Sequence, residues 1–214
     1  MNKKLDVTFV TSSSFKREEN AAFLASCEMN DGRAVNEIFS FNLANNTIRE
    51  PLDVSLTEIV TQEVKAAYGH LKIPCIVEHA GLVFEEFVKD GYPGGLTKPM
   101  WNTLGDRFVE ETHSAGRKAR AVAAIGYCDG MRVHTFIGET VGTLSSEPRG
   151  DRAFYWDTIF VPNESNSERL TYAEIVAVNG LPYKMREYSQ SSKAMLKFLA
   201  WRLDNEPALW KGNY

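Results

Sequence analysis

The chain has 214 residues, 43% of them hydrophobic, with a formal net charge of −4 and a pI of about 5.7. This balance excludes a global basic field for nucleic acid, and no apolar run approaches the roughly 20 residues that a membrane-spanning helix needs. The residues before position 7 contain no apolar signal-peptide core. We therefore expect one compact cytoplasmic domain over residues 1–214, with neither nucleic acid nor membrane as a partner.

The first predicted elements are a strand, a polar loop and a helix. Residues 7–10 form a short β-rich run, the loop Thr11-Ser-Ser-Ser follows, and a helical pattern opens at Lys16. This order directs backbone N–H groups and a helix N-terminus at an anion. Thr11, Ser13 and Lys16 are therefore candidate nucleotide-binding residues. Residues 38–42 alternate and predict a second strand.

The middle of the chain alternates helical and extended patterns. Ser55 is a good N-cap for a helix over residues 56–70, with Glu58 in its first turn. Residues 74–77 predict a buried strand that leads into Glu78 and His79. A Gly- and Pro-rich loop at 91–95 precedes a helix expected over residues 98–112.

The remaining elements set the fold class. Residues 120–127 and 132–139 predict paired strands joined by the Asp129-Gly130 turn, and residues 196–201 predict a closing helix. Helices and strands alternate first and a hairpin follows, so the class is α/β or mixed α+β. Gly105 and Gly116 are candidate breaks between lobes, although neither resembles a linker.

Several charged residues have the chemistry that a triphosphate site needs. Lys16, Lys98 and Arg149 each follow or lie in a loop and can face phosphate. Glu58 and Glu78 offer the oxygen ligands that Mg²⁺ favours. For any one of these Lys or Glu residues taken singly, a solvated surface charge is the favoured interpretation. The chain contains neither a Walker P-loop nor a Gly-x-Gly-x-x-Gly motif.

The segment at 147–157 combines a Pro-Arg-Gly turn with aromatic and acidic residues. Phe154 and Trp156 offer faces on which a base can stack, and Asp157 can read a base edge. A buried aromatic turn is the alternative, because Trp and Phe also dominate protein cores.

Six ordered segments together resemble the Ham1/inosine triphosphatase family, which cleaves non-standard purine nucleoside triphosphates to monophosphate and pyrophosphate. The resemblance extends over about residues 7–200. The segments are Thr11 to Glu19, Glu58 to Leu82, Gly91-Tyr-Pro-Gly-Gly-Leu-Thr-Lys98, Phe136-Ile-Gly-Glu-Thr-Val-Gly142, Pro148-Arg-Gly through Phe154-Tyr-Trp-Asp157 to Pro162, and Thr171-Tyr-Ala-Glu-Ile175.

The resemblance implies an elongated, two-lobed mixed α/β fold with the nucleotide in a central cleft, and commonly a homodimer. It implies that Mg²⁺ is the cofactor and that a purine nucleoside triphosphate is the ligand. The residues that it assigns are Lys16, Lys98 and Arg149 as triphosphate-facing cations or their supports, Glu58 and Glu78 as metal-site carboxylates, and Phe154, Trp156 and Asp157 as the base-binding wall.

The chain departs from the family pattern near the phosphates and the metal. Ser12 and Ser13 replace a Gly-Asn pair, and Ser can still donate to phosphate. His79 replaces the second acid of a Glu-Asp pair that begins at Glu78. An imidazole can serve as a general base, but it suits Mg²⁺ poorly. A solvent-facing histidine is the alternative interpretation.

Two further departures concern the base. Tyr155 replaces a glycine and adds bulk beside the base pocket. The family's Ser-His-Arg motif matches Ser189-Gln190-Ser191, in which Gln190 can still hydrogen-bond a carbonyl oxygen. Lys184 stands for the lysine that precedes this motif in the family, and Arg186 or Lys193 could supply the missing cation.

These departures place a sensor ahead of an enzyme. Retained cations with a damaged acidic pair are expected of a degenerate member that binds a triphosphate, (d)ITP above others, without turning it over. Such proteins resemble the nucleotide-recognising subunit of the Kongming antiphage system, which works with a SIR2-like NAD⁺-consuming effector. The expected assembly is a homodimer or a hetero-complex. The alternative is an active Mg²⁺-dependent pyrophosphatase that acts on (d)ITP or XTP.

Overall fold

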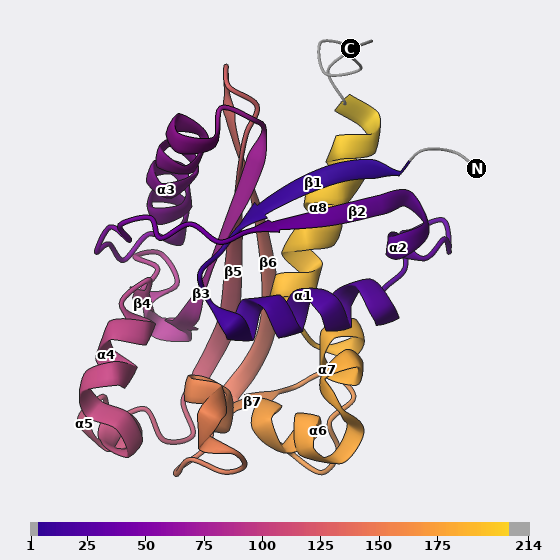
Figure 1. Ribbon diagram of the computed structural model, residues 1–214. Coiled ribbons are helices and arrows are strands. Elements are labelled where there is room, and N and C mark those ends of the chain that lie inside the picture. Colours follow the sequence, from indigo (N-terminus) through magenta and orange to yellow (C-terminus); the bar gives the residue numbers. More distant parts are fainter. Residues whose placement is uncertain (1–3, 206–214) are drawn as a thin grey trace, which may run out of the picture.

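The structure is a computed structural model that describes residues 4–205, except for the side chains of residues 152–154. Its centre is a mixed sheet of seven strands in the order β2-β1-β3-β5-β6-β7, with β4 paired to β3 (Figure 1). The strand β1 runs parallel to β2 and β3, and the remaining pairs are antiparallel. The strands are β1 (Leu5–Val10), β2 (Phe39–Ala44), β3 (Cys75–Phe84), β4 (Pro93–Gly94), β5 (Lys118–Cys128), β6 (Val133–Leu144) and β7 (Phe160–Pro162).

Helices cover both faces of this sheet. Helix α3 packs against β3 and β5, while α8 packs against β5 and β6 and α1 packs against α7. The α-helices are α1 (Ser14–Ser26), α2 (Val35–Ile38), α3 (Leu56–Leu71), α4 (Thr97–Leu104), α5 (Phe108–Glu111), α6 (Tyr172–Asn179), α7 (Leu181–Glu187) and α8 (Gln190–Asn205). The 3₁₀ turns are η1 (Glu85–Phe87), η2 (Gly105–Arg107) and η3 (Arg152–Thr158).

Side-chain alternation along the long strands separates the core into three clusters. On β5, Ile125 joins a cluster with Phe23 and Phe198 from α1 and α8, while its neighbour Ala124 joins Val60 from α3. Successive residues of a strand point to opposite faces, so one strand serves both clusters. A third cluster lies among α4, α5, η3 and α6 and is built on residues from the opposite ends of β3, β5 and β6. The long strands β5 and β6 therefore join two lobes, as Figure 1 shows.

The predicted fold class is confirmed, and most predicted elements are present. The strand at 7–10, the helix at 56–70 and the hairpin after Cys128 all form, with boundaries extended by a few residues. The strand predicted at 74–77 continues to Phe84, so Glu78 and His79 lie within β3 and not after it.

The single helix predicted over residues 98–112 is wrong. The segment divides into α4, η2 and α5. Gly105 ends α4 with a φ of +54° and a ψ of −129°, a conformation that no helical residue adopts and that glycine tolerates. Among residues 4–205, no helix has both the length and the apolar character that crossing a membrane requires.

Candidate functional site

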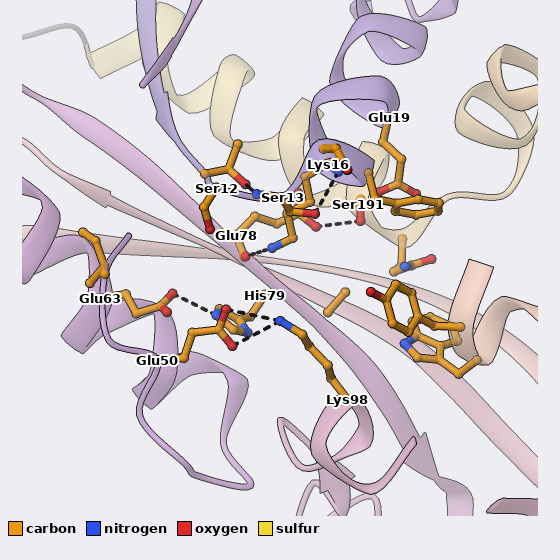
Figure 2. Close-up of a pocket in the computed structure, with 18 of the residues that line it drawn as sticks. Ser12, Ser13, Lys16, Glu19, Glu50, Glu63, Glu78, His79, Lys98 and Ser191 are labelled. Atoms are coloured by element: carbon orange, nitrogen blue, oxygen red, sulfur yellow. Dashed lines mark hydrogen bonds and ion pairs between the residues drawn. The ribbon is translucent and has the colours of Figure 1, made fainter. Parts of the chain in front are cut away.

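A pocket of about 440 Å³ opens where the two lobes meet. Its volume lies within the range of small-molecule sites. Its walls come from the loop between β1 and α1, the loop before α3, the middle of β3, residues 155–157 of η3 and the start of α8 (Figure 2). The lining residues include nine that the sequence predicted: Thr11, Ser13, Lys16, Glu78, His79, Lys98, Trp156, Asp157 and Gln190.

The N-terminus of α1 forms one wall of the pocket. Ser13 caps the helix by accepting a hydrogen bond from the Lys16 N–H at 3.3 Å, and the Ser13 N–H donates to Thr11 Oγ1 at 3.1 Å. These bonds hold the serine loop against a 13-residue helix whose N-terminal partial positive charge favours an anion. The Lys16 ammonium extends across the pocket and donates to the backbone carbonyl of Glu78.

A second cation enters from the opposite side. Lys98 lies in the first turn of α4, and its Nζ is 3.3 Å from Glu50 Oε1 in the loop before α3. Both side chains are about half exposed, so this pair is worth at most about 1 kcal/mol. Lys98 can therefore leave Glu50 for a bound phosphate at little cost. Burial opposes the charge of Glu50, but Lys98 and His79 hold its pKa below the ordinary value.

Glu78 and His79 are neighbours in sequence but make contacts on opposite faces of β3. The Glu78 Oε1 accepts a hydrogen bond from Ser191 Oγ on α8 at 2.8 Å, whereas His79 Nε2 is 2.9 Å from Glu63 Oε2 on α3. Strand alternation is the cause. The two residues therefore do not act as one acidic pair, and each has its own partner.

Glu50, Glu63 and His79 form a cluster of potential ligands. One ligand atom from each lies within 4.8 Å of the others, and Figure 2 shows the three side chains converging. Glu63 and His79 are largely buried, with side-chain exposures of 7% and 14%. The cluster combines two carboxylates with one imidazole at the edge of the pocket.

The other end of the pocket is aromatic and amide-lined. Trp156 is buried, lines the pocket and packs edge-on against Phe160. Gln190, at the start of α8, is also buried, and the Tyr172 hydroxyl lies 3.2 Å from its Oε1. An aromatic surface and an amide are therefore available to one ligand. Phe154, which the sequence placed in this wall, has a side chain outside the described residues.

Below this wall lies a buried triad of charges. Lys184 Nζ is 2.5 Å from Asp157 Oδ2 and 3.2 Å from Glu19 Oε1. Burial disfavours the ammonium, but the two carboxylates outweigh it and hold the pKa of Lys184 above its ordinary value. Burial raises the pKa of Glu19 to about 7, against the opposing effect of Lys184. Burial likewise raises the pKa of Asp157. Lys184 thus lies under the pocket and fixes Asp157 and Glu19.

Besides Lys184, two predicted site residues lie outside the pocket lining. Arg149 donates to the backbone carbonyl of Arg169 at 2.7 Å and pairs with Glu174 at 3.3 Å, so it fastens the turn before η3 to the start of α6. Glu58 lies exposed in the first turn of α3. Glu63, which lies on the same helix, is the carboxylate of α3 that contacts His79, at 2.9 Å.

Sequence reasoning missed Glu63, Glu50 and Glu19. Glu63 carried a usable signal, because it falls on the apolar stripe of α3 between Val60 and Ala67, where a carboxylate is unexpected. Glu50 belongs to a loop and Glu19 to the polar stretch that opens α1, and nothing in their local sequence pattern distinguishes them.

The fold and the pocket together define a mixed α/β protein with a pocket lined by cations, carboxylates and an aromatic wall. The chain belongs to the Ham1 family, whose model matches residues 7–201. It is 33% identical to the dITP/XTP pyrophosphatase of Methanopyrus kandleri over 71% of this chain and 77% of the relative. It is 30% identical to the inosine triphosphate pyrophosphatase of Scheffersomyces stipitis over 79% of this chain and 86% of that protein.

Solved structures show the same fold. The Staphylococcus aureus Ham1 protein superposes with a TM-score of 0.61 at 17% identity, over 94% of this chain and all of that one. At this identity the likeness concerns the fold alone.

Proposed function

We propose that this protein is a nucleoside triphosphate pyrophosphatase that acts on 6-oxo purine substrates such as (d)ITP or XTP. The observation that carries the proposal is the pocket itself, in which a helix N-terminus and two lysines face an aromatic and amide wall. The relatives named above are pyrophosphatases for such substrates. Their names therefore favour an enzyme over the sensor that the sequence placed first.

The triphosphate is proposed to lie between α1 and α4. The N-terminus of α1 and the ammonium groups of Lys16 and Lys98 would neutralise its charge. Both lysines have partners in the structure: Lys16 donates to the backbone carbonyl of Glu78, and Lys98 pairs with Glu50. Either can turn toward phosphate through its flexible side chain.

The base is proposed to lie against Trp156, with Gln190 at its edge. Stacking on an aromatic ring tolerates any base, so the amide supplies the discrimination. The Gln190 amide can donate to a 6-oxo group through Nε2 when its Oε1 accepts from Tyr172. Asp157 is fixed behind Trp156 by Lys184.

Glu78 is proposed to accept the proton of the attacking water. Its carboxylate lines the pocket and is oriented by Ser191 at 2.8 Å, which is the arrangement of a positioned general base. Water would then add to the phosphorus next to the nucleoside, and pyrophosphate would leave.

The family resemblance implies Mg²⁺, and the cluster of Glu50, Glu63 and His79 fits that ion only in part. A divalent cation bound there would neutralise phosphate charge. Mg²⁺, however, favours an all-oxygen shell, and His79 contributes nitrogen. Mg²⁺ therefore stays an expectation from the resemblance.

The test is an incubation of purified protein with deoxyinosine triphosphate and either Mg²⁺ or Mn²⁺, following monophosphate and pyrophosphate. We expect many turnovers, and Glu78→Gln should lower kcat by about 100-fold or more. Glu110→Gln, an exposed change on α5 outside the pocket lining, should behave as the unmodified protein. Release of orthophosphate in place of pyrophosphate would contradict the assigned bond.

The sensor is the second candidate, and the replacement of an acid by His79 favours it. In this alternative the protein is a degenerate family member, and the paired His79 and Glu63 take no part in turnover. A SIR2-like effector in antiphage defence would receive the signal. Stoichiometric retention of intact triphosphate without pyrophosphate would establish this alternative. Under either candidate function we expect a cytoplasmic protein that forms a homodimer or a hetero-complex. Light scattering of the purified protein would measure its oligomeric state.

A further inference from the structure

One of the three donor atoms at the edge of the pocket, the nitrogen of His79, differs in kind from the oxygens that Mg²⁺ selects. Glu50 and Glu63 each offer a carboxylate oxygen, and His79 offers an imidazole nitrogen, all within 4.8 Å of one another. Ligand atoms that share a metal lie about 3 to 4 Å apart, because each bond is about 2 Å long. Because the three atoms lie within 4.8 Å of one another, shifts of about 1 Å would bring them into one coordination shell.

Two of the three ligands are held by rigid elements. Glu63 extends from the middle of α3, and His79 from the middle of β3, where it pairs with Ala124 of β5. Their side chains already touch at 2.9 Å. Glu50 comes from a loop, and its other partner is the half-exposed Lys98. It can adjust toward an ion at little cost.

Imidazole nitrogen shifts metal preference away from Mg²⁺. Divalent first-row transition ions bind nitrogen far better than Mg²⁺ does, and imidazole is among their commonest ligands. Three protein ligands also leave coordination positions open toward the pocket, where phosphate oxygens would lie.

We propose that Glu50, Glu63 and His79 form a site for a first-row transition cation, with Mn²⁺ bound in preference to Mg²⁺. This inference stands on the geometry of the nucleotide-free protein and deepens the proposed function by naming its metal. The alternative is a buried Glu63–His79 pair that holds no ion.

The experiment is isothermal titration of the nucleotide-free protein with MnCl₂ and with MgCl₂, together with the visible spectrum after addition of Co²⁺. We expect one equivalent of Mn²⁺ to bind at least about 10-fold more tightly than Mg²⁺. Bound Co²⁺ should give d–d bands that shift when His79 is changed. These readouts do not involve catalysis.

Variants separate the ligands from their neighbours. Glu63→Gln and Glu50→Gln should each weaken Mn²⁺ binding by about 10-fold or more. Glu58→Gln, on the same helix as Glu63 but exposed and outside the pocket lining, should bind Mn²⁺ as the unmodified protein does. His79→Asp should bring Mg²⁺ affinity up toward that of Mn²⁺. If Glu63→Gln does not fold, Glu50→Gln decides, because Glu50 is a half-exposed loop residue.

Several outcomes would overturn the site. These are Mg²⁺ binding as tightly as Mn²⁺, no Mn²⁺ binding at millimolar concentration, or Mn²⁺ binding that survives both the Glu63 and Glu50 changes. The assay for pyrophosphate is separate. A protein that binds Mn²⁺ but releases no pyrophosphate would retain this inference and lose the proposed enzyme.

Discussion

Tyr155 is held in a left-handed backbone conformation at the rim of the pocket. Its φ is +50°, and the residue is 45% exposed. The left-handed conformation destabilises a residue that has a Cβ by roughly 1–2 kcal/mol, whereas glycine adopts it without this cost. The family resemblance places glycine here. The positive φ explains why glycine suits the position and why tyrosine introduces backbone strain.

We expect Tyr155→Gly to raise the free energy of unfolding by about 0.5–1 kcal/mol, the relief of strain being partly offset by the greater freedom of glycine in the unfolded chain. Chemical denaturation would measure it. Tyr155→Ala is the matched control, because it removes the ring and keeps the strain. Equal stability of the two variants would show that the backbone angle has no energetic consequence.

At the scale of elements, the buried triad connects α1, η3 and α7 through Glu19, Asp157 and Lys184. Glu19 and Lys184 are 165 residues apart in the sequence. Burial raises the pKa of Glu19 to about 7 from an ordinary value of 4.5. The folded state therefore binds a proton at Glu19 more tightly than the unfolded chain does. The stability that this proton contributes is complete below about pH 4.5 and is lost as the pH rises through about 7.

As the pH rises from 4.5 to 7, the free energy of unfolding of the unmodified protein should fall relative to that of Glu19→Gln. The expected fall is on the order of 2–3 kcal/mol. Glutamine cannot ionise, so the difference between the two proteins isolates this group from the other carboxylates. Denaturation curves at several pH values would measure it. A constant difference across the range would mean that Glu19 titrates alike in both states.

Element boundaries were predictable where the local pattern is strong. Ser55 does cap α3 by accepting from the Glu58 N–H at 3.2 Å, and Asp129 does organise the hairpin loop by accepting from two backbone N–H groups. The helix expected across Gly105 was wrong because its apolar residues continue on both sides of a glycine that adopts a φ of +54°. The sequence marked Gly105 as a candidate break between lobes but did not show that the helix ends there.

At the scale of the whole molecule, the pocket exists only where distant segments meet. Its walls include Thr11 near the N-terminus, His79 in the middle of the sheet and Gln190 at the start of the last helix. A ligand that contacts all of them is lost on unfolding, so binding should stabilise the entire fold.

Deoxyinosine triphosphate at about 100 times its Kd should add about 2.7 kcal/mol, which corresponds to a rise in Tm of about 5–10 °C for a domain of this size. Lys98→Ala should reduce the rise with triphosphate more than the rise with deoxyinosine monophosphate. Arg107→Ala, an exposed cation that pairs with Glu111 outside the pocket lining, serves as the control. Equal losses with both ligands would contradict a phosphate role for Lys98.

The sequence by itself determined the family, the mixed α/β class and nine of the residues that line the pocket. These follow from periodicity, turn chemistry and motif order, which are properties of short segments. Only the tertiary structure decided the partners. It placed Glu63 and not Glu58 beside His79, buried Lys184 between two carboxylates, and turned Arg149 away from the pocket. The physical reason is that a side chain's partner depends on which distant element packs against its own, and on which face of a strand or helix it lies.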